Sequence, residues 1–280
     1  MRGLLLLTLA NVVGFLLLSW VTTVFYAAYL ELPLALIAMH NAVRQSQWQS
    51  YGIAAALIPH RRFVGLAWAV GLGLVNGLVH VASLNALSIS RGGAGLPFDE
   101  LLLRMSVPAY ETVGVFALMQ AMRFTLGWHI ARACQPLHLQ RGQFRIGDLL
   151  EWTASVAVWL GINQFIKVEV ASLFHYVMSI VSAAMILIPI ALATTSQRGL
   201  YGRTFLALLM WIVAVELFFN VLGYALDARA FTRPWWFWLT MSIGSIAGYL
   251  LPTGINFVII RRLGFRWVIT QSRSTGRSTA

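Results

Sequence analysis

Long apolar runs alternate with short polar connections along almost the whole chain. A helix needs about 20 apolar residues to cross the hydrocarbon core of a bilayer. Seven runs meet this requirement and predict transmembrane helices, at 4–29, 63–86, 108–130, 149–167, 170–193, 204–226 and 236–260. The sequence therefore predicts an all-α polytopic bundle of about seven spans. We expect one transmembrane domain, residues 1–268, followed by a basic tail, residues 269–280, whose polar composition is typical of disorder.

Composition supports a membrane setting. The chain is 59% hydrophobic and only 10% charged, whereas soluble domains average about 25% charged residues. The net charge of +11 comes from basic residues spread between the apolar runs, which favours anionic lipid headgroups as partners and argues against nucleic acid. A lone cysteine, Cys134, excludes an internal disulfide. No histidine has a second ligand at metal spacing, so we expect no metal and no cofactor.

The basic residues also predict an orientation, because cytoplasmic connections carry an excess of Arg and Lys. With seven spans, the side that holds the C-terminus has fourteen basic residues: Arg44, Arg61, Arg62, Arg123, Arg132, Arg141, Arg145, Arg198, Arg203, Arg261, Arg262, Arg266, Arg273 and Arg277. The opposite side has six: Arg2, Arg91, Arg104, Lys167, Arg229 and Arg233. We therefore expect a cytoplasmic C-terminus and, for an odd number of spans, an N-terminus outside the cell membrane.

The stretch 34–60 has two interpretations. Its apolar residues are mixed with Arg44, several glutamines, Trp48 and Tyr51. This mixture is typical of an amphipathic helix that lies in the plane of the lipid headgroups. A loop that begins with a short helix fits the pattern equally well.

Polar residues inside the predicted spans are candidates for function. Glu216 lies near the middle of the sixth run, where an ionised acid costs about 2.5–3.5 kcal/mol. Asn220 follows it by one turn, and His80 and Asn76 share a face of the second run. Arg123 lies about 6 Å from the predicted centre of its own run, within reach of Glu216. If these three runs are neighbours, the residues form a substrate-binding or proton-relay cluster.

Each of these residues also has a structural explanation. Arg123 can extend to the cytoplasmic surface, and the polar residues can join helices through hydrogen bonds. Glu111, Asp148 and Glu151 lie near the predicted starts of runs, where acids complement the helix dipole without any catalytic role.

Two segments resemble parts of known membrane proteins. Residues 143–161 resemble a segment of uncharacterised planctomycete membrane proteins, a likeness carried by Phe144, Leu149, Leu150, Thr153, Val156 and Ala157. This resemblance implies a bacterial origin and no particular activity. Residues 256–265 are similar to the end of GtrA-like proteins at Asn256, Phe257, Arg261 and Phe265. That resemblance implies a part in moving lipid-linked sugars.

A third segment, 98–105, resembles the first motif of CAAX-type intramembrane proteases, with Asp99, Glu100 and Arg104 at the matching positions. The resemblance implies that Glu100 would activate water together with a histidine such as His129. The later motifs of that family are absent from this chain.

The sequence thus favours a non-enzymatic membrane protein of the bacterial inner membrane. It would either handle or transport a small or lipid-linked molecule, or serve as a membrane subunit with protein partners or in a homo-oligomer. No catalytic residue is assigned in this interpretation. The alternative is a CAAX-type hydrolase that uses Glu100.

Overall fold

The structure is a computed structural model, and it is built almost entirely of helices. It describes residues 9–10, 12–14, 16–17, 20, 34–58, 63–90, 92–95, 97–132, 146–166, 170–195, 206–215, 217–218 and 235–269. The helices are α2 (Leu34–Leu57), α3 (Val64–Ser90), α4 (Phe98–Leu126), α5 (Ile146–Ile166), α6 (Val170–Thr195) and α8 (Trp235–Arg262). Two short strands, β1 (Trp128–Arg132) and β2 (Phe265–Ile269), complete the described elements.

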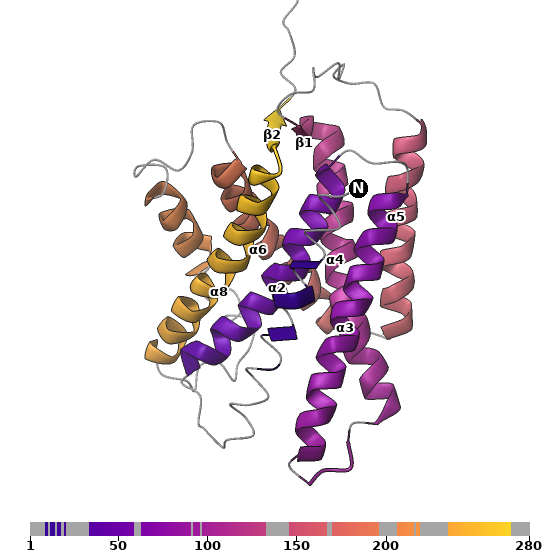
Figure 1. Ribbon diagram of the computed structural model, residues 1–280, viewed down its shortest axis with the longest axis vertical. Helices are drawn as coiled ribbons and strands as arrows, with labels where there is room; N and C mark the ends of the chain where they lie inside the picture. Colours follow the sequence, from indigo (N-terminus) through magenta and orange to yellow (C-terminus); the bar gives the residue numbers. More distant parts are fainter. Residues whose placement is uncertain are drawn as a thin grey trace, which may run out of the picture.

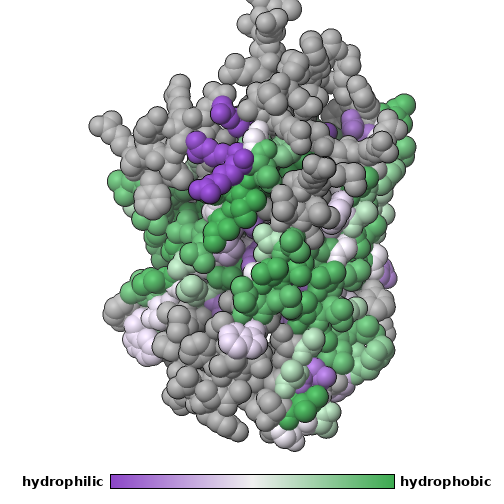
Figure 2. Space-filling view, viewed as in Figure 1, coloured by the Kyte–Doolittle hydropathy of each residue, from purple (hydrophilic) through white to green (hydrophobic). Residues whose placement is uncertain are grey.

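The chain is a helical membrane protein. Within the described residues, three helical segments are long and apolar enough to cross a bilayer: Val64–Ala82, Phe98–Leu126 and Leu239–Arg262. Large apolar side chains are exposed along them, including Leu78, Leu103 and Ile255, and Figure 2 shows apolar surface over the middle of one face. Such continuous exposed apolar surface suits lipid rather than water. The described part of the chain thus accounts for three of the seven predicted spans.

Most helix boundaries agree with the hydropathy pattern, and α4 is the main exception. The sequence predicts a span at 108–130, but α4 begins ten residues earlier, at Phe98. Asp99 and Glu100 in its first turn complement the helix dipole, and the helix continues through Pro108. It ends at Leu126 because Gly127 adopts a left-handed conformation and donates its N–H to the carbonyl of Arg123.

The first interpretation of residues 34–60 correctly predicts a helix, but neither interpretation predicts its place in the interior of the bundle. Residues 34–57 form one helix, α2, which runs diagonally through the bundle between α8 on one side and α3 and α4 on the other (Figure 1). From Ser46 to Ile58 every residue is buried. The polar side chains of α2 find hydrogen-bond partners on its neighbours, so a sequence that looks interfacial is stable at the centre of the fold.

Glycines let the central helices approach closely. The Gly244/Gly248 pair predicts a tight contact, and a Cβ at Gly248 would lie 2.5 Å from the carbonyl oxygen of Met39 in α2. A second pair of this spacing, Gly73 and Gly77, packs α3 against α4, where a Cβ at either residue would overlap the backbone. Small residues four apart are the usual means by which membrane helices come together.

A two-stranded ribbon joins the ends of α4 and α8. β1 pairs with β2 in antiparallel fashion, with Trp128 opposite Ile269 and Arg132 opposite Phe265. The sequence predicts helix for residues 128–130, so β1 is a correction to that prediction. Residues 270–280, the rest of the predicted tail, lie outside the described residues.

Candidate functional site: a polar core between α2, α3 and α4

Glu111 is a fully enclosed acid at the middle of a candidate span. It is the fourteenth of the 29 residues of α4 and is only 6% exposed. Trp48 donates its indole N–H to the Glu111 carboxylate at 2.6 Å, and the side-chain amide of Gln49 donates at 3.0 Å. Both donors come from α2. The Trp48 bond is short, as hydrogen bonds to a charged acceptor are, and the Gln49 bond has ordinary length. α2 therefore stabilises the carboxylate that α4 carries into the bundle.

Arg44 lies one turn before Trp48 on α2 and links it to α3. Its guanidinium lies over the Trp48 ring, 5.6 Å from the centroid, and Nη2 is 3.0 Å from Nε2 of His80. Because a guanidinium has only donors, Nε2 of His80 must be the acceptor in this hydrogen bond. Arg44 is also close enough for its charge to act on Glu111. A cation and an acid therefore share this interior.

We define the polar core as six residues: Arg44, Trp48, Gln49, Asn76, His80 and Glu111. Asn76 lies one turn before His80 on the same face of α3 and is fully buried. The far side of α2 is joined to α8. There, Tyr249 donates to Gln45 at 2.8 Å and the Asn256 amide donates to Ser50 at 2.7 Å. These contacts fix α2, and with it the three α2 members of the polar core.

Several buried atoms of the polar core have no hydrogen-bond partner among the described residues. They are both amide atoms of Asn76, Nε of Arg44 and the amide oxygen of Gln49. Leaving such a group unsatisfied costs about 1–3 kcal/mol, and native proteins leave few of them unpaired. The polar core therefore offers free donors and acceptors beside its two charges, an arrangement suited to water or to a polar solute.

The predicted cluster is only partly comparable with this site. Glu216 and Asn220 lie outside the described residues. His80 and Asn76 do lie together in the interior, and the runs that carry them and Arg123 are neighbours, since α3 packs against α4. The partner of His80 is Arg44, a residue that the sequence places outside every predicted span.

Arg123 is not near the middle of its helix. Because α4 starts at Phe98, its centre lies near residue 112, and Arg123 is about 16 Å away along the axis. It donates to the carbonyl oxygen of Ala56 at 3.3 Å, in the last turn of α2, where a cation complements the helix dipole. The chain between α2 and α3 is also held by α5. Glu151 of α5 accepts a hydrogen bond of 3.1 Å from the backbone N–H of Phe63, just before α3. Arg123 and Glu151 therefore position α2 and α3.

Glu111 was missed because its helix was predicted to start at 108. The sequence does contain the necessary signal, since the acids that follow Pro97 are typical of a helix start. A single helix from Phe98 through the apolar run 108–130 would have placed Glu111 near its middle. Glu151 does act at a helix start, as predicted, but at that of α3 rather than at that of its own helix.

The CAAX-like residues do not belong to the polar core, although Arg104 is close enough for its charge to act on Arg44 and His80. Glu100 and Arg104 form an exposed pair with a distance of 2.6 Å in the first turns of α4. His129 belongs to β1, beyond the other end of α4, so the helix separates it from Glu100 by about 40 Å. Among the residues searched, which are the described ones, no three His, Cys, Asp or Glu side chains are grouped as metal ligands.

Comparisons with known protein families, curated proteins and solved structures found no match to this chain. The three short resemblances therefore stay predictions. Asn256, one of the GtrA-like residues, hydrogen-bonds to α2, and Thr153 of the planctomycete-like segment hydrogen-bonds within α5.

Proposed function

We propose that this chain is a multi-pass protein of a bacterial inner membrane that binds, and in transport would pass on, a small molecule with charged or hydrogen-bonding groups. The polar core would hold that molecule or its polar head. One observation carries the proposal. The side chain of Asn76 is fully buried, and its two amide atoms have no hydrogen-bond partner among the described residues. A group that only joined helices would be paired, because its hydrogen bonds would be its purpose.

The charges of the polar core suggest the class of molecule. Arg44 and Glu111 offer opposite charges within one interior, with Asn76 and Gln49 as neutral partners. A zwitterionic group such as a phosphate joined to an amine would find complementary partners for both of its ends. The similarity of residues 256–265 to GtrA-like proteins supports a lipid-linked molecule.

A role as a membrane subunit is the second non-enzymatic candidate. In that role the polar core would serve packing alone, and its buried polar atoms would pair with one another. The unpaired atoms of Asn76 favour handling of a molecule instead. A hydrolase that uses Glu100 gains no support from the described contacts, because this acid is paired with Arg104 in the first turns of α4.

The orientation follows from the number of crossings. We propose a cytoplasmic C-terminus, as the basic residues indicate. α2 is about 36 Å long and extends between the two ends of the bundle (Figure 1), which supports counting it as a crossing in addition to the seven predicted runs. Arg2 then lies on the same side as the C-terminus, and Arg44 lies within a crossing and is counted on neither side. The remaining basic residues divide fourteen on the C-terminal side against five on the opposite side. An even count places both termini in the cytoplasm, in place of the N-terminus outside that seven spans predict.

A ligand-stabilisation screen tests the proposed function. The purified protein would be heated in detergent with four probes: phosphoethanolamine, glycerol 3-phosphate, choline and a hexose. A ligand present at 100 times its dissociation constant stabilises the folded state by about 2.7 kcal/mol. We expect phosphoethanolamine to raise the unfolding temperature, and the Asn76→Leu and Glu111→Gln variants to lose this shift. Asp99→Asn, which removes an exposed acid from the first turn of α4, is the matched control. Equal responses in all three variants would contradict the proposal.

A further inference from the structure

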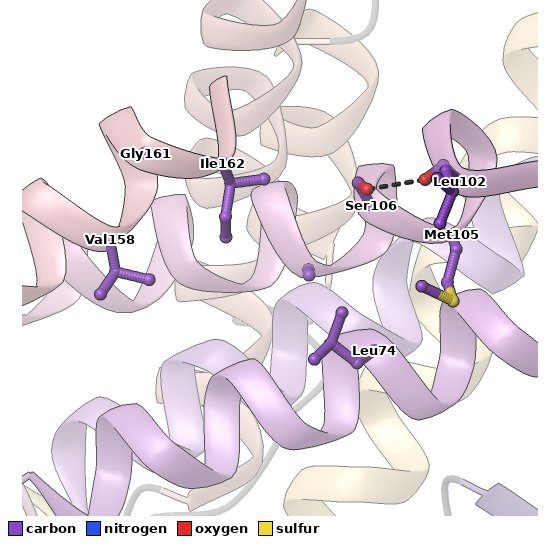
Figure 3. Close-up of a pocket in the computed structure, with 8 residues that line it drawn as sticks. Leu74, Leu102, Met105, Ser106, Val158, Gly161 and Ile162 are labelled. Atoms are coloured by element: carbon purple, nitrogen blue, oxygen red, sulfur yellow. Dashed lines mark hydrogen bonds between the residues drawn. The ribbon is translucent and has the colours of Figure 1, made fainter. Parts of the chain in front are cut away.

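A hollow lined by apolar side chains lies on a different part of α4 from the polar core. It has a volume of about 450 Å³ and is formed where α3, α4 and α5 meet. Leu74 from α3, Leu102, Met105 and Ala109 from α4, and Val158 and Ile162 from α5 line it. Figure 3 shows these side chains, except for the unlabelled Ala109, directed toward a common space from the three helices. This volume lies within the usual range of small-molecule pockets.

A glycine helps to create the hollow, and its lining offers no free polar group. Gly161 lies in the wall on α5, and a Cβ built on it would meet no atom within 4 Å. Ser106 is the one hydroxyl of the lining, and its Oγ donates to the carbonyl oxygen of Leu102 at 2.7 Å (Figure 3). Its donor is therefore used within α4. The pocket offers an occupant dispersion contacts and no free charge.

The depth of the pocket matches one leaflet of a bilayer. Leu102 lies about 6 Å and Ala109 about 17 Å from the start of α4 along its axis. A helix of this length exceeds the hydrocarbon core of about 30 Å by about 6 Å at each end. The lining thus begins near the headgroup level and ends near the midplane. That is the range of depth that one acyl chain occupies.

The pocket also opens to the lipid side of the bundle. Two residues of its lining are exposed: Leu74, at 40%, and Gly161. Surfaces of this kind on a transmembrane helix face acyl chains, because they contain nothing that water could satisfy.

We propose that this pocket binds one acyl chain of a bilayer phospholipid, laterally and within a single leaflet. The proposal rests on the apolar lining, the depth and the lateral opening, and it does not depend on the role of the polar core. The bound chain fills the gap that Gly161 leaves between α3 and α5.

Photo-crosslinking tests the site. The full-length protein would be placed in nanodiscs of phosphatidylethanolamine and phosphatidylglycerol that contain a phosphatidylglycerol with a diazirine on its acyl chain. We expect crosslinks to be enriched at Leu74, Met105 and Ile162 by at least about fivefold over Leu239, an exposed residue of α8 that contacts only general lipid. Equal labelling of the pocket and of Leu239 would overturn the proposal.

Two variants fill the pocket from opposite walls. Gly161→Phe on α5 and Leu74→Trp on α3 should each reduce the pocket crosslinks by at least about fivefold, because the new ring excludes the chain. Gly71→Phe is the matched control, since its added Cβ also meets no atom within 4 Å but it lies outside the lining. Unchanged crosslinks in both filled variants would overturn the proposal. So would an absence of lipid adducts at the pocket together with a dimeric mass of the protein in light scattering, which would make a second copy of the chain the occupant.

Discussion

Glu111 is central at the residue scale. A carboxylate at mid-membrane is stable only where its charge is paired or hydrogen-bonded, and here α2 supplies the indole of Trp48 and the amide of Gln49. Arg44 supplies a nearby positive charge, and its own guanidinium is held by the Trp48 ring and by His80. The two charges and their polar neighbours therefore depend on one another, and Trp48 contacts both.

Removing the indole N–H of Trp48 should show how far the Glu111 carboxylate depends on this hydrogen bond. Trp48→Phe keeps an aromatic ring but leaves the Glu111 carboxylate with one hydrogen bond fewer, so we expect a loss of about 1.5–3 kcal/mol in unfolding free energy. The loss should be smaller in a Glu111→Gln background, since a neutral acceptor forms a weaker bond. Unfolding in detergent would measure both. Trp236→Phe, an exposed tryptophan, is the control. An equal loss in both backgrounds would contradict a bond between Trp48 and Glu111.

Sequence reasoning found part of this site. His80 and Asn76 could be paired from their spacing on one helix, because periodicity shows which residues share a face. Arg44, the partner of His80, could not be predicted as part of the site, since a basic residue among glutamines is typical of solvent or the headgroup region. Only the packing of α2 between its neighbours shows that the guanidinium of Arg44 is enclosed by Trp48 and His80.

At the scale of elements, the close approach of α3 and α4 brings the polar core together. Gly73 and Gly77 allow it, because the backbone of α4 occupies the space where their side chains would be. Apolar periodicity predicts that these two helices exist, but it does not state their distance. The predicted Gly244/Gly248 contact was confirmed at Gly248, and the Gly73/Gly77 contact shows that the same signal was overlooked in α3.

Adding a methyl group to a glycine at this contact should push α3 and α4 apart. Gly77→Ala places a methyl group against the carbonyl of Met105, and overpacking of this kind costs about 1–3 kcal/mol. Gly71→Ala, on the same helix with no atom within 4 Å of the added Cβ, should be neutral or stabilising by up to about 1 kcal/mol. Thermal unfolding of the two variants measures the difference. A Gly77→Ala protein as stable as the Gly71→Ala protein would contradict the close contact.

At the scale of the whole molecule, α2 changes the account of the fold. Hydropathy predicted the apolar helices because each carries its own signal. It could not predict α2 as a helix of the bundle, because its polar residues are stable there only through partners on α3, α4 and α8. If α2 crosses the membrane, the connections before and after it lie on opposite sides. The seven-span prediction places both on the cytoplasmic side.

Cysteine labelling distinguishes these two topologies. In a Cys134→Ser background, Leu32→Cys precedes α2 and His60→Cys follows it. We expect an impermeant maleimide to label Leu32→Cys in intact cells, and to label His60→Cys only after the membrane is permeabilised, because Arg61 and Arg62 favour the cytoplasm. Labelling of both positions from the same side would contradict a crossing by α2.

The central claim is that the polar core, in the absence of a ligand, is hydrated rather than dry. X-ray hydroxyl-radical footprinting tests it on the unaltered protein in nanodiscs, since radicals form from water and modify the side chains beside it. We expect Trp48 and His80 to be oxidised despite their position in the interior, because water pairs with the free atoms of Asn76 and Arg44. Phe116 and Phe257, fully buried in apolar surroundings, should remain unmodified. If Trp48 and His80 are as protected as these two phenylalanines, the polar core is dry and the account is wrong.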